Sequence, residues 1–192
     1  IHQKSYPAST TKLMTCLIAA ENAKLQETVK FSQDAVFSIE SGSSNIGIDA
    51  GQSMPMEECL YGILVASANE VANGVAEHIA GDMDSFADMM NKKAEEIGAE
   101  NTHFVTPNGL DSDEHYSTAY DMAMMARELI RHEKILEFSS IYEDYLRKNT
   151  DNSFWLVNTN KLVRFYSYID GLKTGYTGKA GYCLTATGKK NG

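Results

Sequence analysis

The chain has 192 residues, of which 43% are hydrophobic and 22% are charged. This composition is typical of a globular protein rather than a disordered one, and the length suits one compact domain over residues 1–192. The net charge of −9, with 17 Lys and Arg scattered among 26 acids, argues against a nucleic-acid partner, which would need a basic face. No segment is long and apolar enough to span a bilayer, so we expect any export signal or membrane anchor to lie outside this sequence.

Apolar residues at helical spacing dominate the chain up to about residue 130. The first of these stretches is apolar around most of its circumference, which predicts a central helix rather than a surface one. A polar, Gly/Ser-rich excursion at residues 33–51 is expected to be irregular. The predicted helices cover residues 7–24, 54–81 with a pause at 66–69, 84–97, and a stretch that begins at Thr118, where Asp121 stands at capping distance.

Beyond residue 140 the pattern changes to shorter runs rich in aromatic and β-branched residues, which predict strands. Helices followed by strands indicate an α+β fold rather than alternating βαβ units. The chain stops at Asn191-Gly192, the favoured two-residue hairpin turn, so we expect a further strand after it. The predicted strands cover residues 141–146, 154–159, 169–174 and 182–187.

The cysteines and histidines show no metal-ligand spacing. Cys16 and Cys59 lie in apolar helical contexts and are expected to be buried free thiols; Cys183 is far from both in sequence. Asp111, Asp113, Glu114 and His115 cluster in a turn, where solvated side chains are the default expectation. No phosphate-binding loop is present, and we expect no metal and no organic cofactor.

Ser9 and Lys12 are three residues apart at the predicted start of the first helix, so their side chains share a face. A lysine with a lowered pKa can take the proton of a serine hydroxyl, and the helix N-terminus favours a developing oxyanion. The same spacing also arises by chance in a chain of this length, and a serine at a helix start is often only a cap.

Two further motifs follow in order. Ser67-Ala68-Asn69 lies at the break between two apolar helical stretches, where side chains can project into a cleft; Ser43-Ser44-Asn45 has the same pattern but lies in the polar excursion without such support. Lys173-Thr174-Gly175 ends a predicted strand and offers a cation, a hydroxyl and backbone amides in a row. The alternative interpretation is that Lys173 is an ordinary exposed lysine.

The three motifs together resemble the S-x-x-K, S-D-N and K-T-G set of β-lactamases and penicillin-binding proteins. More specifically, the chain resembles the D-alanyl-D-alanine carboxypeptidases, the low-molecular-mass penicillin-binding proteins, which are serine peptidases. The resemblance runs over nearly the whole chain and includes residues 6–15, 67–72, 76–81, 101–104, 107–111, 117–119, 158–160 and 170–177.

The resemblance implies a β-lactamase/transpeptidase-like fold, in which a helical cluster packs on an antiparallel sheet whose strands appear truncated at both chain ends. It also implies removal of the terminal D-alanine from peptidoglycan stem pentapeptides through an acyl-enzyme, with β-lactams as covalent inhibitors. The enzyme would work outside the cytoplasmic membrane, secreted or anchored to it by a segment absent from this sequence.

The resemblance also implies a role for each matching residue. Ser9 would be the nucleophile, Lys12 its general base, and Ser67 a proton relay to the leaving D-alanine. Asn69 would orient the substrate amide, with Gly175 lining the substrate site. Lys173 and Thr174 would hold the terminal carboxylate, and the backbone N–H groups of Ser9 and Tyr176 would form the oxyanion hole.

Ala68 and Glu70 depart mildly from the residues that the family usually shows, which are glycine and aspartate. Two other functions remain open on the sequence. One is a class A β-lactamase, although residues 133–137 match its deacylating glutamate element only superficially. The other is a peptidoglycan-binding or sensing module without turnover.

Overall fold

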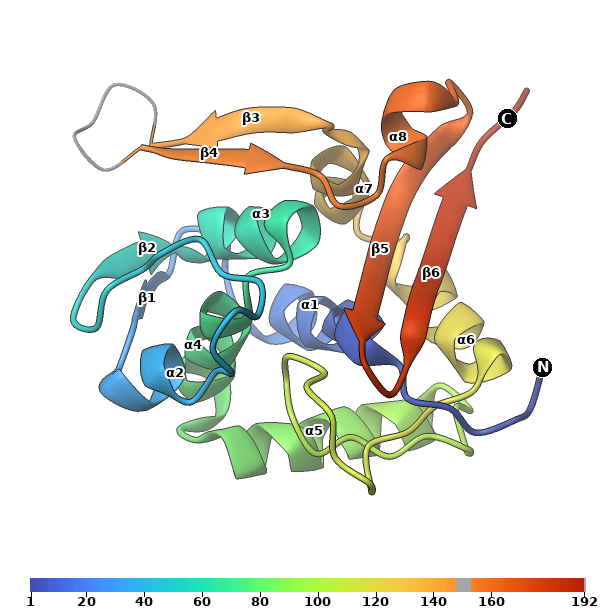
Figure 1. The fold of residues 1–192 in the computed structure, drawn as a ribbon, viewed down its shortest axis with the longest axis horizontal. Helices are drawn as coiled ribbons and strands as arrows, with labels where there is room; N and C mark the ends of the chain where they lie inside the picture. Colours follow the sequence, from blue (N-terminus) through green and yellow to red (C-terminus); the bar gives the residue numbers. More distant parts are fainter. Residues whose placement is uncertain (148–152, 192) are drawn as a thin grey trace.

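The computed structural model of the protein describes residues 1–147 and 153–191. The helices enclose one hydrophobic core. A long β-hairpin lies across them (Figure 1). The helical elements are η1 (Ala8–Thr11), α1 (Lys12–Asn22), α2 (Gln33–Phe37), α3 (Met56–Ala66), α4 (Asn69–Ala80), α5 (Met83–Glu96), α6 (Ala119–Leu129), α7 (Glu133–Ser140) and α8 (Leu162–Phe165).

The described strands form three separate two-stranded antiparallel sheets. The predicted α+β class is therefore confirmed, although these strands do not join into the one sheet that was expected. The strand pairs are β1 (Thr28–Lys30) with β2 (Ser53–Pro55), β3 (Glu143–Leu146) with β4 (Phe154–Val157), and β5 (Ile169–Thr177) with β6 (Gly181–Gly188).

Helix α1 is the centre of the apolar core, as its sequence predicted. Its residues from Lys12 to Ala19 are all buried, and α3, α4, α5 and α6 pack around it. Cys16 in α1 and Cys59 in α3 are buried free thiols, which confirms their expected state. A helix surrounded in this way fixes the position of Lys12 at its start and of Ser9 in η1, the short helix that leads into it.

The helix boundaries follow local signals. The hydroxyl of Thr118 accepts the Asp121 N–H at 3.1 Å and begins α6 as predicted. Helix α4 ends at Gly81, whose φ of 91° lies in the left-handed region that favours glycine. Helix α3 ends instead at Ser67, a residue with a side chain in the same left-handed region, with φ 61°.

Five elements were not predicted. Helix α2 lies in the excursion expected to be irregular, and Ser32 caps it by accepting the Ala35 N–H. Strands β1 and β2 have three residues each, too few to show a period of two. Helix α7 has eight residues and α8 has four. The turn at residues 158–160 replaces the expected end of β4, which stops at Val157.

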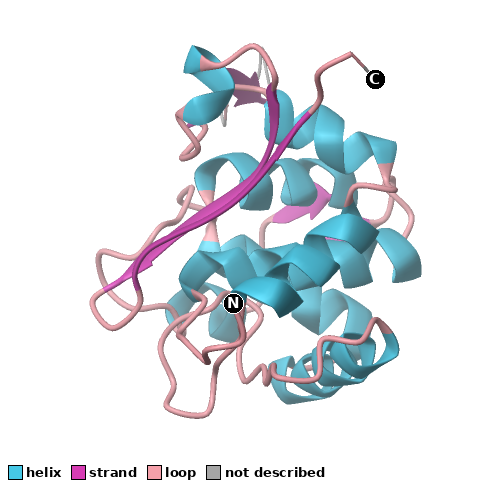
Figure 2. Cartoon of the chain, turned by 90° about the vertical axis from the view of Figure 1, so that its right-hand side faces the viewer, coloured by secondary structure: helices cyan, strands magenta, loops and turns pink. Residues whose placement is uncertain are grey.

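The β5–β6 hairpin places the third motif against the first. Figure 2 shows this ribbon crossing the helices diagonally, and β5 packs against η1 and α7. The hairpin is longer than predicted because its pairing continues to Thr177 and Gly181. Gly192 of the expected Asn-Gly turn lies outside the described residues. Among the described residues, no helix is both long and apolar enough to cross a membrane.

Candidate active site

The three sequence motifs meet at one cavity of about 580 Å³. Ser9, Ser67, Asn69 and the β5 residues from Thr174 to Tyr176 line it, while Lys12 and Lys173 are completely buried behind its wall. Residues that are up to 167 positions apart in the sequence therefore form one site, as the resemblance implied. The lysine of each flanking motif is withdrawn from solvent, not exposed as the structural alternative for Lys173 required.

Lys12 contacts three groups with its side-chain nitrogen. Its Nζ lies 2.9 Å from Ser9 Oγ, 2.6 Å from Asn69 Oδ1 and 2.6 Å from the Asn108 backbone carbonyl oxygen. The two shorter contacts are to oxygens that can only accept. A neutral amine has two protons and one lone pair, so these two acceptors take both protons and the lone pair faces Ser9. The geometry thus suits transfer of the Ser9 proton to Lys12.

Burial is the first reason that Lys12 can be neutral. It lowers the pKa of Lys12 well below its ordinary value, and the nearby charge of Lys173 lowers it further. Burial also lowers the pKa of Lys173 to about 7. Lys173 Nζ donates to the Thr174 carbonyl oxygen at 2.9 Å. Of the two lysines, Lys12 is therefore the one whose surroundings favour the neutral base.

Two residues beside the reactive groups have left-handed backbone conformations, Ala8 with φ 48° and Ser67 with φ 61°. Such conformations cost roughly 1–3 kcal/mol in residues with side chains, and persist where the surroundings fix them. Gly109 is part of those surroundings at Ala8, because a Cβ at Gly109 would overlap the Ala8 carbonyl oxygen. The first motif is thus held by a close backbone contact from a distant turn.

Gly175 allows β5 to approach η1. A Cβ at this position would lie 2.8 Å from Ser9 N and 3.0 Å from Thr10 N, closer than real side chains pack. The absence of a side chain therefore sets the distance between the Ser9 amide and the strand that carries Tyr176. These are the two amides that the resemblance assigned to an oxyanion hole.

The Ser67-Ala68-Asn69 motif lies at the cavity, but within the described chain it makes only one side-chain hydrogen bond to the first motif. Asn69 receives Lys12 at its Oδ1, and among the described residues no acceptor takes its Nδ2 group. Ser67 lines the cavity but makes no hydrogen bond to Ser9 or Lys12, both of which are described. Its expected role as a proton relay therefore remains a prediction.

Sequence reasoning missed a buried amide network behind Lys12. The backbone carbonyl of Asn108 accepts Lys12, and its side-chain Nδ2 donates to Asn73 Oδ1 at 2.9 Å. Asn73 Nδ2 in turn donates to the Ala35 carbonyl and to Ser38 Oγ. The Pro107-Asn108-Gly109 turn was recognisable in sequence, but nothing in sequence indicated that its carbonyl meets a lysine 96 positions away.

His115 is not the solvated turn residue that its neighbours suggested; it is 1% exposed. Its Nδ1 accepts the N–H groups of Val105 and Thr106, at 2.9 and 3.3 Å, so the proton is on Nε2. Nε2 therefore donates to Thr11 Oγ1 at 2.8 Å. Burial lowers the pKa of His115 to about 4, which keeps the ring neutral at pH 7. The ring ties the 105–109 turn to the residue preceding Lys12.

The polar loop that contains Ser43-Ser44-Asn45 also reaches the site. Ser43 and Ser44 line the cavity, and the Ser44 carbonyl accepts the Asn69 N–H at 2.9 Å. Glu70 holds this loop: it is 1% exposed, and its Oε1 accepts the Ile46 N–H at 2.7 Å. Glu70 is thus a positioning residue, not only a mild departure beside the motif.

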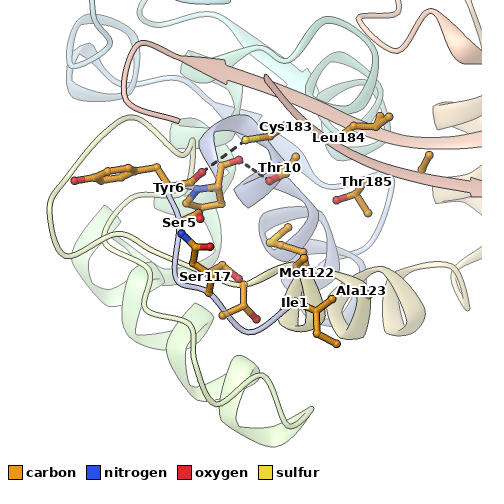
Figure 3. A pocket seen from close by; sticks show the side chains of 15 residues that line it. Ile1, Ser5, Tyr6, Thr10, Ser117, Met122, Ala123, Cys183, Leu184 and Thr185 are labelled. Carbon is orange, nitrogen blue, oxygen red and sulfur yellow. Dashed lines mark hydrogen bonds between the residues drawn. The ribbon is translucent and has the colours of Figure 1, made fainter. Parts of the chain in front are cut away.

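A second cavity of about 560 Å³ lies beside β6 and shares Cys183 and Leu184 with the first. Figure 3 shows its lining of Ile1, Tyr6, Met122 and neighbouring residues, with Cys183 directed toward the Tyr6 carbonyl. The described residues that line it include no lysine or histidine that could activate a nucleophile. Ser9 and Lys12 therefore mark the first cavity as the candidate active site.

Comparison with known proteins identifies the family of the chain. The family model described as D-alanyl-D-alanine carboxypeptidase matches residues 1–192. The carboxypeptidase DacF of Bacillus subtilis (strain 168) is 48% identical, over 98% of this chain and 49% of its own length. DacA of Escherichia coli (strain K12) is 37% identical over 94% of this chain and 46% of its own.

Solved structures of penicillin-binding proteins have a similar fold. Penicillin binding protein 6B from Escherichia coli superposes with a TM-score of 0.89 at 31% identity, covering 99% of this chain and 62% of that one. The chain spans about half the length of the curated relatives it matches. The match of the family model over the whole chain shows that this chain belongs to the D-alanyl-D-alanine carboxypeptidase family.

Proposed function

We propose that the protein containing this chain is a serine-type D-alanyl-D-alanine carboxypeptidase that removes the terminal D-alanine from peptidoglycan stem pentapeptides. The observation that carries the proposal is the environment of Lys12, a buried lysine whose Nζ lies 2.9 Å from Ser9 Oγ and 2.6 Å from each of two carbonyl oxygens, a geometry in which a neutral amine can direct its lone pair toward Ser9. Such a lysine removes the main obstacle to serine catalysis, which is the weak nucleophilicity of the hydroxyl.

In the first step, Ser9 Oγ attacks the penultimate D-alanine carbonyl and its proton passes to Lys12 Nζ. The N–H groups of Ser9 and Tyr176 stabilise the oxyanion, and Gly175 permits their close approach. The C–N bond then breaks, and Ser67 relays a proton from Lys12 to the departing D-alanine nitrogen. Asn69 orients the substrate amide, and Thr174 holds the terminal carboxylate with the charge of Lys173, which is buried behind the cavity wall and hydrogen-bonded to the Thr174 carbonyl oxygen.

In the second step, water attacks the acyl-enzyme, and the ester oxygen of Ser9 takes back a proton as the shortened peptide leaves. β-Lactams would acylate the same serine, because their strained amide occupies the position of the scissile bond. Among the described residues that line the cavity, none carries a carboxylate, and Glu133 lies at the start of α7 outside this lining. A long-lived β-lactam adduct is therefore expected rather than the rapid turnover of a class A β-lactamase.

The substrate implies an extracytoplasmic location, secreted or at the outer face of the cytoplasmic membrane, with anchoring by a segment outside this sequence. The peptidoglycan stem peptide is the proposed partner, and β-lactams are proposed inhibitors.

Mass spectrometry of the whole protein after incubation with benzylpenicillin tests the proposal, together with D-alanine release from a stem pentapeptide. We expect one adduct and release of D-alanine, both abolished by Ser9→Ala. An adduct that survives Ser9→Ala would refute Ser9 as the nucleophile. Adduct formation without D-alanine release would favour the binding or sensing module.

A further inference from the structure

The Asn158-Thr159-Asn160 turn resembles the family in sequence but has no role in the mechanism above. Its two asparagines are 2% and 1% exposed, whereas Thr159 between them is exposed. Two buried amides that flank an exposed hydroxyl suggest that the turn is built to present Thr159.

The hydrogen bonds of Asn158 fix the first half of the turn. Its Nδ2 donates to the Ser139 and Ile141 carbonyl oxygens at 2.9 and 2.8 Å, and its Oδ1 accepts the Asn160 N–H at 2.8 Å. Each polar atom of this side chain is satisfied by backbone, so the turn is tied firmly to the end of α7.

Asn160 and the backbone of Thr159 fix the second half. Asn160 Nδ2 donates to the Gly171 carbonyl of β5 at 3.0 Å. The Thr159 N–H donates to the Val65 carbonyl at 3.1 Å, two residues before Ser67. The turn is thereby connected to the strand that bears Lys173 and to the helix that ends at Ser67.

Thr159 and Thr174 both line the cavity that Ser9 lines, and their hydroxyl oxygens lie 2.7 Å apart. Two hydroxyls joined by one hydrogen bond use one of their two protons in that bond. The other proton is available to an acceptor in the cavity. A carboxylate has two oxygens that only accept, so it suits this pair of hydroxyls better than a neutral amide does.

The charge of the cavity lining also suits an anion. Lys161, in the same turn, is the one charged side chain among the described residues that line the cavity. It lies two residues from Thr159 in the sequence. An anionic group of the substrate would meet two hydroxyls and one cation here.

We propose that Thr159 is a specificity-determining residue that, together with Thr174, binds the terminal carboxylate of the D-alanyl-D-alanine substrate. The inference rests on the proposed carboxypeptidase function and extends it to a residue outside the three motifs. Thr159 selects substrates that end in a free carboxylate over substrates in which that end is blocked.

The test compares two peptides that both end in D-alanyl-D-alanine, one with a free carboxylate and one with a C-terminal amide. The whole protein is used in excess over peptide, so that slow reaction of the amide is measurable in a single turnover. Hydrogen bonds to charged groups contribute about 1.5–3 kcal/mol, which corresponds to about 10- to 100-fold in rate. We expect Thr159→Val to lower kcat/KM for the free acid at least tenfold and for the amide less than twofold.

Thr159→Ser keeps the hydroxyl and should retain most of the preference for the free acid. Thr28→Val, the same change at an exposed site on β1, is the matched control and should alter neither substrate. Equal losses on both peptides would show that Thr159 is only structural, and an unchanged preference in Thr159→Val would also overturn the proposal. Failure of the wild-type protein to release D-alanine from the free acid and D-alaninamide from the amide would instead overturn the proposed function.

Discussion

The neutral state of His115 predicts a specific dependence of stability on pH. In the folded protein Nδ1 accepts two backbone N–H groups, so a proton can bind there only if both hydrogen bonds break. The pKa of His115 is accordingly lowered from 6.5 to about 4. Phe104 packs edge-on against the ring, His103 lowers the pKa further, and the carboxylate of Asp111 opposes the shift.

The direction and size of the effect follow from linkage. Between pH 6.5 and pH 4 the unfolded chain binds a proton at this histidine and the folded chain does not, so the free energy of unfolding falls as the pH falls. Each unit of pKa difference corresponds to about 1.4 kcal/mol. With these pKa values, lowering the pH from 7 to 5 should remove about 2 kcal/mol of stability.

His115→Gln isolates this contribution. Glutamine can accept through its carbonyl oxygen and donate through its amide, but it does not titrate. Urea unfolding of the wild-type whole protein and the variant at pH 7, 6 and 5 gives the difference in slope directly, because other titrating groups are common to both. We expect the variant to lose about 2 kcal/mol less than the wild-type protein between pH 7 and pH 5. Parallel pH profiles would refute the assignment of the proton to Nε2.

Three further predictions concern the proposed catalytic groups. Lys12→Arg, which cannot become neutral, should slow acylation by penicillin about 10²- to 10⁴-fold in a stopped-flow assay, while a rate within threefold of the wild type would exclude Lys12 as the base. Gly175→Ala should lower the acylation rate about 100-fold or more by pushing β5 away from Ser9 N, with unfolding measurements to show that the variant is folded. Glu70→Ala should speed hydrogen exchange at Ile46 and neighbouring amides, whereas Glu70→Gln, which keeps the acceptor, should change it little; equal exchange in both variants would contradict the loop-holding role.

Local sequence patterns were sufficient for the long helices. Helix α1 was predicted as central because apolar residues cover its circumference, and Thr118 and Gly81 marked two boundaries by well-known capping chemistry. Elements of three to five residues, such as β1 and α2, were missed because their pairing or packing, not their own pattern, determines them. The resemblance likewise implied one sheet, whereas the described strands pair only two by two.

The residues of the three motifs could be predicted from the sequence. The contacts that distant segments make with the first motif could not. Ser9, Ser67 and Lys173 were identified because three motifs occur in order. Asn108 and His115 contribute through a backbone carbonyl and a ring nitrogen that meet the first motif across about 100 residues of chain, at separations of 96 and 104. Neither contact leaves a signal in a single sequence. Any residue could supply the carbonyl, and a buried histidine cannot be told from an exposed one by its sequence alone.

The two buried lysines show why the motifs alone do not assign the chemistry. Both side chains are fully buried, and burial lowers the pKa of each. Lys12 additionally faces two carbonyl oxygens that orient a neutral amine, whereas the titration of Lys173 near pH 7 leaves it partly charged at neutral pH. Because a charge on Lys173 disfavours a second charge on Lys12, we propose that Lys12 acts as the base and Lys173 as the cation.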